Sequence, residues 1–201
     1  TQGLTSNQAI QAQEQQVRAT ALASLAAEVL PKGTPAIYGS ELNVSFETVE
    51  QSLDILAKFD DHIDHTKFSR EELDSYVWIG TNISCEFCCG AQAMVFTKEQ
   101  ADSINRQYEQ AGRTERVHEG DRACGCAHSY AMRGLAKYLI KNHRNEFTDQ
   151  QILEEVAKWK AVFFPGPTVE KIATQQGLIP SQISAANNRG STGIPSQVGG
   201  C

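Results

Sequence analysis

Five of the six cysteines stand in two short clusters, and thiols at this spacing are the residues of the chain best suited to chemistry. The first cluster reads Cys85-Glu86-Phe87-Cys88-Cys89-Gly90, and the second reads Cys124-Gly125-Cys126-Ala127-His128. Thiolate and imidazole groups are ligands for zinc, copper(I) and iron–sulfur clusters. The spacing therefore predicts a metal site with six candidate ligands: Cys85, Cys88, Cys89, Cys124, Cys126 and His128.

The first cluster follows a stretch with helical spacing of its apolar residues. This stretch opens at Ser69 with the residue types of a capping box, which predicts a helix that runs towards Gly90. If the helix continues through the cluster, Cys85, Cys88 and Cys89 stand at i, i+3 and i+4, so that their thiols share one face. We therefore expect a helical face lined with sulfur.

The second cluster is expected at the start of another helix, where Cys124, His128 and Met132 fall at i, i+4 and i+8. Helix N-termini favour thiolates and prepare the sulfur to bind metal. The two methionines, Met94 and Met132, each lie within six residues of a cluster cysteine. Thioethers are soft ligands, which favours copper(I), although Met is also an ordinary core residue. Four thiolates can equally close a zinc site, so copper and zinc are favoured over iron–sulfur.

Disulfides are the alternative state of the same cysteines. In an exported protein six cysteines can pair into three disulfides, and Cys201 can join a neighbouring subunit. The vicinal residues Cys88 and Cys89 can still pair with two different partners. His128 favours the metal, because a disulfide framework does not need a histidine two residues after a cysteine. The sequence leaves both states open.

Other groupings of polar residues predict less chemistry. Residues 60–65, Asp-Asp-His-Ile-Asp-His, hold five potential ligands for a divalent cation. A solvated acidic loop between two helices is favoured, because the Gly-containing spacing of a calcium loop is missing. Cys126 and His128 are two residues apart and would point to opposite sides of a helix, which disfavours a thiol nucleophile with its base. We find no catalytic constellation and do not predict an enzyme.

Helical spacing continues through nearly the whole chain, which predicts an all-α fold. We expect a small helical bundle with a polar N-terminal helix and an extended C-terminal tail. The predicted parts are residues 1–33 for the N-terminal helix, 34–176 for the helical Cys/His domain and 177–201 for a Gly/Ser-rich tail. A second capping box at Thr148 predicts the start of another helix. Residues 97–112 are predicted to form a polar helix at the surface.

Composition and charge exclude several classes of protein. The 201 residues carry 18 Lys+Arg and 24 Asp+Glu, which gives a net charge of -6. Because no run of Lys and Arg is present to neutralise phosphates, we expect no nucleic-acid partner. A content of 40% hydrophobic residues is enough for a packed core. No stretch of about 18 apolar residues occurs, so no membrane span is expected in this chain.

Both ends of the chain predict contacts with partners. Residues 7–16 contain five Gln and only Ile10 as a large apolar residue, which is typical of a helix that stands in solvent or packs on a partner. Residues 177–201 carry one charge, Arg189. A homo-oligomer or a larger assembly through the N-terminal helix and the tail is the simplest prediction. Two Asn-x-Ser/Thr tripeptides, at Asn43 and Asn82, favour an extracytoplasmic location.

The cysteine motifs resemble those of a known group of proteins. The stretches Ile83-Ser84-Cys85-Glu86-Phe87-Cys88-Cys89-Gly90 and Ala123-Cys124-Gly125-Cys126-Ala127-His128-Ser129 resemble cysteine-rich proteins of archaea and candidate-phylum bacteria, which are predicted to be exported or membrane-anchored. The likeness covers about residues 75–165, with residues 97–118 as an insertion. The group has no assigned activity, so the resemblance implies an exported location and a shared cysteine site, and no particular chemistry.

Three functions follow as hypotheses. The first is an exported helical metal-binding protein that holds the ion for structural, storage or carrier purposes. The alternative is a disulfide-stapled structural subunit of an extracellular filament or other surface assembly. A third is electron transfer by an iron–sulfur or copper centre. The first rests on the six clustered donors, and the second rests on the even number of cysteines together with the composition of the two chain ends.

Overall fold

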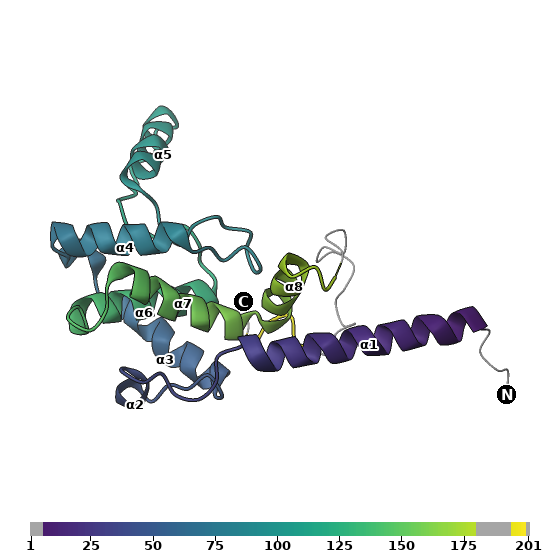
Figure 1. The fold of residues 1–201 in the computed structure, drawn as a ribbon. Helices are drawn as coiled ribbons and strands as arrows, with labels where there is room; N and C mark the ends of the chain where they lie inside the picture. Colours follow the sequence, from purple (N-terminus) through teal and green to yellow (C-terminus); the bar gives the residue numbers. More distant parts are fainter. Residues whose placement is uncertain (1–5, 180–193, 200–201) are drawn as a thin grey trace. The chain divides into compact units, whose positions relative to one another are not determined.

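The computed structural model describes residues 6–179 and 194–199, and the regular structure of these residues is helical. Besides the helices, two isolated backbone bridges occur in these ranges. The predicted all-α class is therefore confirmed, and Figure 1 gives the order of the elements. The helices are α1 (Ser6–Val29), α2 (Gly39–Leu42), α3 (Val49–His62), the 3₁₀ helix η1 (His65–Lys67), α4 (Arg70–Asn82), α5 (Lys98–Gln110), α6 (Ala127–Asn142), α7 (Asp149–Phe163) and α8 (Pro165–Gln175).

The helices belong to two compact units. Unit 1 comprises the described residues of Thr1–Pro31 and Ala161–Val198, and unit 2 comprises Lys32–Lys160 with Gly199. The structure thus groups α8 with the N-terminal helix, whereas the sequence pattern placed residues 161–176 in the Cys/His domain. Most of the predicted tail, residues 177–201, lies outside the described residues, and so does Cys201.

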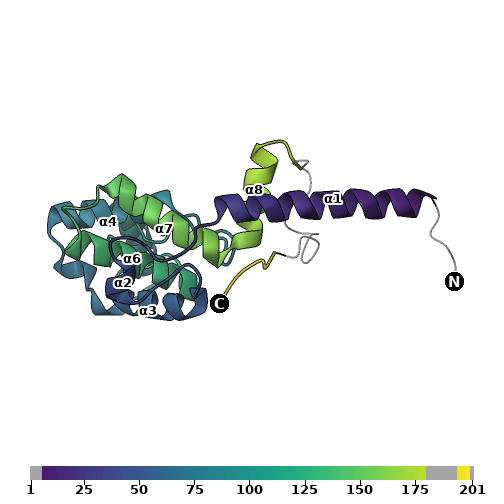
Figure 2. The ribbon, with the colours of Figure 1, turned by 60° about the horizontal axis from the view of Figure 1, so that its bottom comes forward.

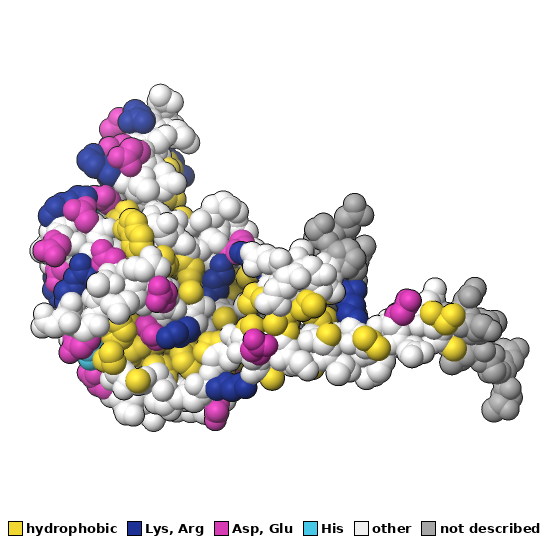
Figure 3. Space-filling model, viewed as in Figure 1, with side chains coloured by type: hydrophobic (Ala, Val, Ile, Leu, Met, Phe, Trp, Pro, Cys, Tyr) yellow, Lys and Arg dark blue, Asp and Glu magenta, His cyan; other side chains and the backbone are white. Residues whose placement is uncertain are grey.

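Unit 1 is held together by the second half of α1. The predicted N-terminal helix is confirmed within residues 1–33 and runs from Ser6 to Val29. Its apolar stripe packs on α8 in a buried cluster that contains Leu22, Leu25, Val169, Ala173 and Ile179. The first half of α1 shows mainly uncharged polar side chains (Figure 3), and Ile10 and Val17 are 54% and 64% exposed. The first half of α1 is therefore a polar half-helix whose large apolar side chains are exposed.

Unit 2 is built around α6, whose residues are buried on nearly all sides. Helices α3 and α4 both pack against α6, and the two views agree on this arrangement (Figures 1 and 2). Besides its apolar residues, α6 buries His128, Ser129, Arg133 and Lys137, and buried polar groups need partners inside the protein. At Gly134 the backbones of α6 and α3 meet, since an added Cβ would overlap the carbonyl oxygen of Leu56.

Capping boxes start three helices of unit 2. Ser69 caps α4 as predicted, with its hydroxyl accepting from the Glu72 N–H while the Glu72 carboxylate accepts from the Ser69 N–H. Thr148 caps α7 in the same way, with Gln151 as the reciprocal partner. A third box, at Thr97, starts α5. Each box satisfies backbone donors that a helix start otherwise leaves without partners.

Helix α5 belongs to an excursion from the helical core of unit 2, as its polar sequence predicts. Only Ala101 among its residues is buried, and acidic and basic side chains are mixed over its surface (Figure 3). The Asn105 side chain closes the excursion by two hydrogen bonds to the Val117 backbone, of 2.8 and 2.9 Å. The excursion is therefore closed by hydrogen bonds of its own. Its two ends, near Phe96 and Gly120, are hydrogen-bonded to each other where they leave the core.

Candidate metal centre

The first cysteine cluster lies on a turn. Helix α4 ends at Asn82, and Ile83 has extended backbone angles. The prediction of a helix through to Gly90 is therefore wrong, and the thiols do not share a helical face. Instead the N–H groups of Cys88 and Cys89 both donate to the Cys85 carbonyl oxygen at 3.2 Å. Gly90 follows with a φ of 71°, which reverses the chain at a position suited to glycine.

The second cluster lies at the N-terminus of α6, as predicted, but most of it precedes the helix. Cys126 is the N-cap residue, and its sulfur accepts a hydrogen bond from the Ser129 N–H at 3.4 Å. Cys124 lies outside the helix, so the predicted helical stripe of Cys124, His128 and Met132 is wrong. The Ser129 hydroxyl donates to the carbonyl oxygens of Cys124 and Cys126 at 3.0 and 2.9 Å, which fixes the backbone of the cluster.

The base of the excursion brings the two clusters together. The Ala123 N–H donates to the Met94 carbonyl at 3.0 Å, the Phe96 N–H to the Asp121 carbonyl at 2.9 Å, and the Gly120 N–H to the Phe96 carbonyl at 2.9 Å. These bonds pair the segment that follows the first cluster with the segment that precedes the second. The sequence pattern did not predict this pairing, because the paired segments are too short for an alternating strand pattern.

Four sulfur atoms form the larger donor group. The Sγ atoms of Cys85, Cys89, Cys124 and Cys126 all lie within 4.8 Å of one another. Cys85 and Cys126 are 3.1 Å apart and Cys124 and Cys126 are 3.6 Å apart, sulfur to sulfur. The sulfur atoms of Cys89 and Cys124 are in direct contact as a disulfide-like pair. Cys85 and Cys124 are buried, whereas Cys89 is exposed, so solvent reaches one side of the group.

Three residues form a second donor group that overlaps the first. The sulfur atoms of Cys88 and Cys126 and an imidazole nitrogen of His128 lie within 4.8 Å of one another. Cys88 is itself disulfide-bonded in the structure. His128 is completely buried. Each of the six predicted residues therefore contributes a donor atom to one group or to both, and the predicted convergence of the two clusters is confirmed. Their role as metal ligands stays a prediction.

Hydrogen bonds lower the pKa of the Cys126 thiol. The sulfur atoms of Cys85 and Cys126 share a hydrogen bond, which lowers the pKa of Cys126 and raises the pKa of Cys85. Hydrogen bonds from His128 and Ser129 lower the pKa of Cys126 further, against the effect of burial. The expectation that Cys126 and His128 point apart is wrong, because Cys126 has an extended N-cap backbone that places its sulfur beside the imidazole.

The larger group could hold a metal ion. A Zn–S distance of about 2.3 Å places two thiolates of one tetrahedral ion roughly 3.8 Å apart. The separations from Cys126 of 3.1 and 3.6 Å are shorter than this value, so the sulfur atoms would have to move apart to surround such an ion. The Cα atoms of Cys89 and Cys124 are 7.1 Å apart, beyond the usual span of a disulfide. The donor set of four thiols therefore suits zinc or copper(I).

A buried charge cluster next to the sulfur site was not predicted. Asp60 was expected in a solvated loop, but its side chain is completely buried at the end of α3. Its carboxylate accepts hydrogen bonds from Arg133 at 2.8 Å and Arg122 at 2.9 Å, and it forms an ion pair with Lys137 at 2.8 Å. The Lys137 ammonium donates to the Asp60 backbone carbonyl at 2.7 Å. Burial alone raises the pKa of this carboxyl, but the hydrogen bonds and charges of Arg133 and then Lys137 hold it below its ordinary value. The expectation of a solvated acidic loop is wrong for Asp60.

Arg133 connects the charge cluster to both cysteine segments. Its Nη1 donates to the carbonyl oxygen of Cys124 at 2.8 Å and to that of Met94 at 3.3 Å. The same guanidinium is held by Asp60, so the charge cluster fixes the backbone that carries the second set of thiols. A signal for this arrangement was available, since Arg133 and Lys137 stand at i, i+4 inside an apolar helical run, where cations need a buried partner.

The rest of the acidic stretch has partners within the protein. Asp61 is exposed and pairs with Arg122. Asp64 caps η1 by accepting from the Thr66 N–H at 3.0 Å. His65 lies 3.1 Å from Asp121. These groups line an open hollow of about 650 Å³, and the divalent-cation hypothesis for this stretch stays a prediction.

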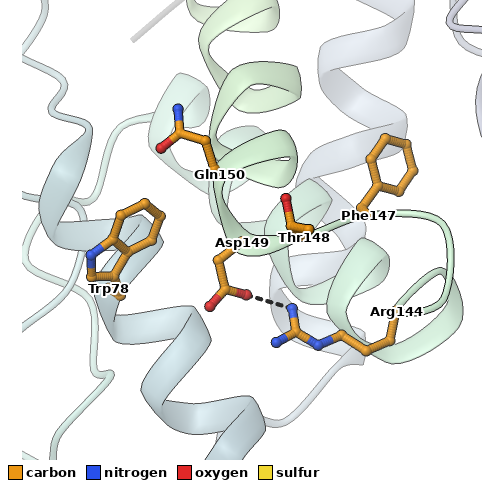
Figure 4. Close-up of a pocket in the computed structure, with 6 residues that line it drawn as sticks. All are labelled: Trp78, Arg144, Phe147, Thr148, Asp149 and Gln150. Atoms are coloured by element: carbon orange, nitrogen blue, oxygen red, sulfur yellow. Dashed lines mark hydrogen bonds and ion pairs between the residues drawn. The ribbon is translucent and has the colours of Figure 1, made fainter.

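A second hollow lies between α4 and the start of α7 (Figure 4). Arg144 forms an ion pair with Asp149 across it, and Ser75 hydrogen-bonds to both of these side chains. Trp78 borders the hollow and is 40% exposed. The charges of this hollow neutralise each other, so the thiol groups remain the part of unit 2 best equipped for chemistry.

Comparison of the chain with protein-family models, with curated proteins and with solved structures found no match. Among the residues that the structure describes, none of the helices combines the length and the apolar character needed to cross a bilayer. The function is therefore inferred from the residues of the site. Its composition is thiol-rich, and it joins two segments that lie far apart in the sequence.

Proposed function

We propose that this chain is a metal-binding protein that holds a thiophilic ion, zinc or copper(I), through four thiolates. The observation that carries the proposal is the larger donor group, in which four sulfur atoms lie within 4.8 Å of one another. Sulfur donors in such numbers select soft or borderline metals over magnesium and calcium, which prefer oxygen. The ligands are Cys85, Cys89, Cys124 and Cys126.

Burial of the ligands supports a carrier or storage role for the ion. Cys85 and Cys124 are buried and hold the ion in a fixed geometry, whereas Cys89 is exposed. An exposed thiolate gives an incoming thiol a route for ligand exchange, which a closed structural site does not offer. The ion would also cross-link the turn at residues 85–90 to the N-terminus of α6.

Metal loading of the reduced protein tests this proposal. Protein purified under a reductant and loaded with zinc or with copper(I) is expected to keep bound ion in native mass spectrometry. Cys85→Ser and Cys124→Ser remove ligands and are expected to lose it. His118→Ala is the matched control, because this potential ligand is 70% exposed and lies outside both donor groups. Reduced protein that retains no ion would end the proposal. Elemental analysis of protein from its native source identifies the metal.

A disulfide-stapled structural subunit of a surface assembly is the second candidate function. Two observations favour it: the direct contact of the Cys89 and Cys124 sulfur atoms and the disulfide bond of Cys88. In an oxidising compartment outside the cell these thiols would persist as a disulfide and staple the two segments. Intact mass without reduction distinguishes the candidates: a disulfide lacks one pair of hydrogens and binds no ion, and a metal site keeps both thiols and gains the mass of the ion.

A further inference from the structure

The six donors cannot all bind one ion. Two ligands of the same ion are separated by at most twice the metal–ligand distance, roughly 4.6 Å for zinc and sulfur. The donors form a group of four and a group of three, each within 4.8 Å internally, rather than one group of six. Cys88 and His128 belong only to the smaller group, and Cys126 alone belongs to both.

We propose that the site holds two metal ions and that the Cys126 thiolate bridges them. This inference rests on the proposed function, since the first ion takes Cys126 together with the other three cysteines of the larger group. In the reduced protein, the second ion takes Cys126 and His128 together with Cys88, whose thiol is released when its disulfide is reduced. Three protein ligands leave one position of a tetrahedral ion open, and a water molecule or an exogenous thiol can occupy it.

The surroundings of Cys126 suit a bridging sulfur. Its Sγ lies 3.1 Å from Cys85 and 3.6 Å from Cys124 on the side of the larger group, and within 4.8 Å of Cys88 and His128 on the side of the smaller group. The Ser129 N–H also donates to this sulfur. An N-cap position holds the residue by the backbone of α6, which keeps the sulfur between the two groups.

Charge favours the second ion. Four thiolates with one divalent ion carry a charge of -2, and five thiolates with two divalent ions carry -1, so the second ion reduces the net charge of a partly buried site. His128 adds a neutral ligand, because a metal-bound imidazole has given up its proton. Lys160 lies near Cys85 but is paired with Glu86 at 2.6 Å, so it contributes little net positive charge to the site. Two divalent ions therefore leave a smaller imbalance than one.

Zinc stoichiometry tests the second position separately from the first. Native mass spectrometry of reduced, zinc-loaded wild type is expected to give two ions per chain. Cys88→Ser and His128→Ala are each expected to give one, because they remove ligands of the second ion alone. One ion in the wild type would overturn this inference and leave the proposed function standing. No ion at all would overturn both.

A matched pair of variants controls for folding. His128 is completely buried, so its replacement can weaken the fold, whereas Cys88 is only partly buried and is the safer test. Both variants are expected to keep the wild-type far-ultraviolet circular dichroism. If Cys88→Ser is folded and still binds two ions, the second ion does not use Cys88 and the inference fails.

Cadmium NMR tests the bridge itself. Two cadmium ions that share the Cys126 sulfur are expected to give two resonances with scalar coupling to each other, since only a common ligand atom transmits that coupling. Two uncoupled resonances would show separate sites and overturn the bridging assignment. Cys126→Ser is expected to abolish the coupling and to reduce the number of retained ions below two.

Discussion

The charge cluster and the sulfur site are neighbouring polar regions of unit 2 that stabilise their polar groups differently. The Asp60 carboxylate is buried against cations supplied by the chain itself, of which Arg133 and Lys137 lie on α6. The sulfur donors face one another. A buried charge can be compensated by a counter-ion from the same chain, whereas a group of thiolates needs a bound cation to compensate its charge. The first region can therefore be structural by itself, and the second calls for a ligand.

The two regions also differ in what carries them. Asp60 and its partners on α6 lie on long helices that pack against each other, so their distances follow from helix packing. The cysteines lie on a turn and at an N-cap, and short backbone pairing positions these segments. Arg133 connects the two regions, since it binds Asp60 and the Cys124 carbonyl. Substitutions in the charge cluster should therefore mainly change the free energy of unfolding, and substitutions in the sulfur site should mainly change metal binding.

The largest effect is expected from Asp60→Asn. This change leaves two buried cations without their counter-ion, and breaking a buried ion pair in this way costs about 3 to 5 kcal/mol. The free energy of unfolding from urea titration measures it. Asp61→Asn is the matched control, because Asp61 is exposed and an exposed pair contributes about 0 to 1 kcal/mol. Equal losses in the two variants would show that Asp60 has no special role.

Acid should remove the same stabilisation in the wild type. The pKa of Asp60 is lower in the folded protein than its ordinary value of about 3.9, so the folded state disfavours the protonated form. The stabilisation is therefore complete above pH 4 and is lost as the pH falls through the folded-state pKa. Urea midpoints measured from neutral pH downwards are expected to converge for wild type and Asp60→Asn. A constant gap between them across the acid range would contradict this assignment.

Arg133→Met should affect both regions. It removes the hydrogen bonds that the guanidinium donates to the carbonyls of Cys124 and Met94, and a hydrogen bond from a charged donor contributes about 1.5 to 3 kcal/mol. Because Arg133 holds the backbone of a ligand, zinc affinity is also expected to fall about 10- to 100-fold. A competing chelator measures the affinity. Arg116→Met, at an exposed arginine, is the control. Unchanged affinity in a destabilised Arg133→Met would show that the two regions act independently.

The smallest effect is expected from Ser69→Ala. This change removes the cap of α4 and should lower the free energy of unfolding by about 1 kcal/mol. The metal stoichiometry should stay at the wild-type value, because the cysteine turn is held by its own backbone hydrogen bonds and by its pairing with Ala123. A loss of bound ion in this variant would mean that α4 positions the cysteines after all. Thermal unfolding and native mass spectrometry give the two readouts.

The helices were largely predictable from the sequence, because capping residues and apolar spacing act locally. Ser69 and Thr148 start helices as predicted. The end of α4 was not predicted, because the residues after Asn82 keep a helical pattern of cysteines while tertiary hydrogen bonds select a turn. Local patterns thus give helix starts more reliably than helix ends.

The composition of the site was predictable, but its division was not. All six donors were identified from residue type and spacing, since thiols and imidazole are rare and clustered. Their grouping depends on the backbone pairing of Met94 with Ala123, which carries no pattern of its own. The burial of Asp60 likewise depends on α6, more than seventy residues further along the chain. Long-range contacts of this kind leave only indirect traces in one sequence.

Gly134, the residue after Arg133, allows α6 and α3 to pack closely. A methyl group here would take the place of the Leu56 carbonyl oxygen and come within 3.0 Å of the Asp60 nitrogen. Helix α3 would have to move away from α6. Asp60 would then move away from the Arg133 guanidinium, which also binds the Cys124 carbonyl. The distance between α3 and α6 therefore helps to set the positions of the thiols near the start of α6. A residue larger than glycine at position 134 would therefore also change the positions of the proposed metal ligands.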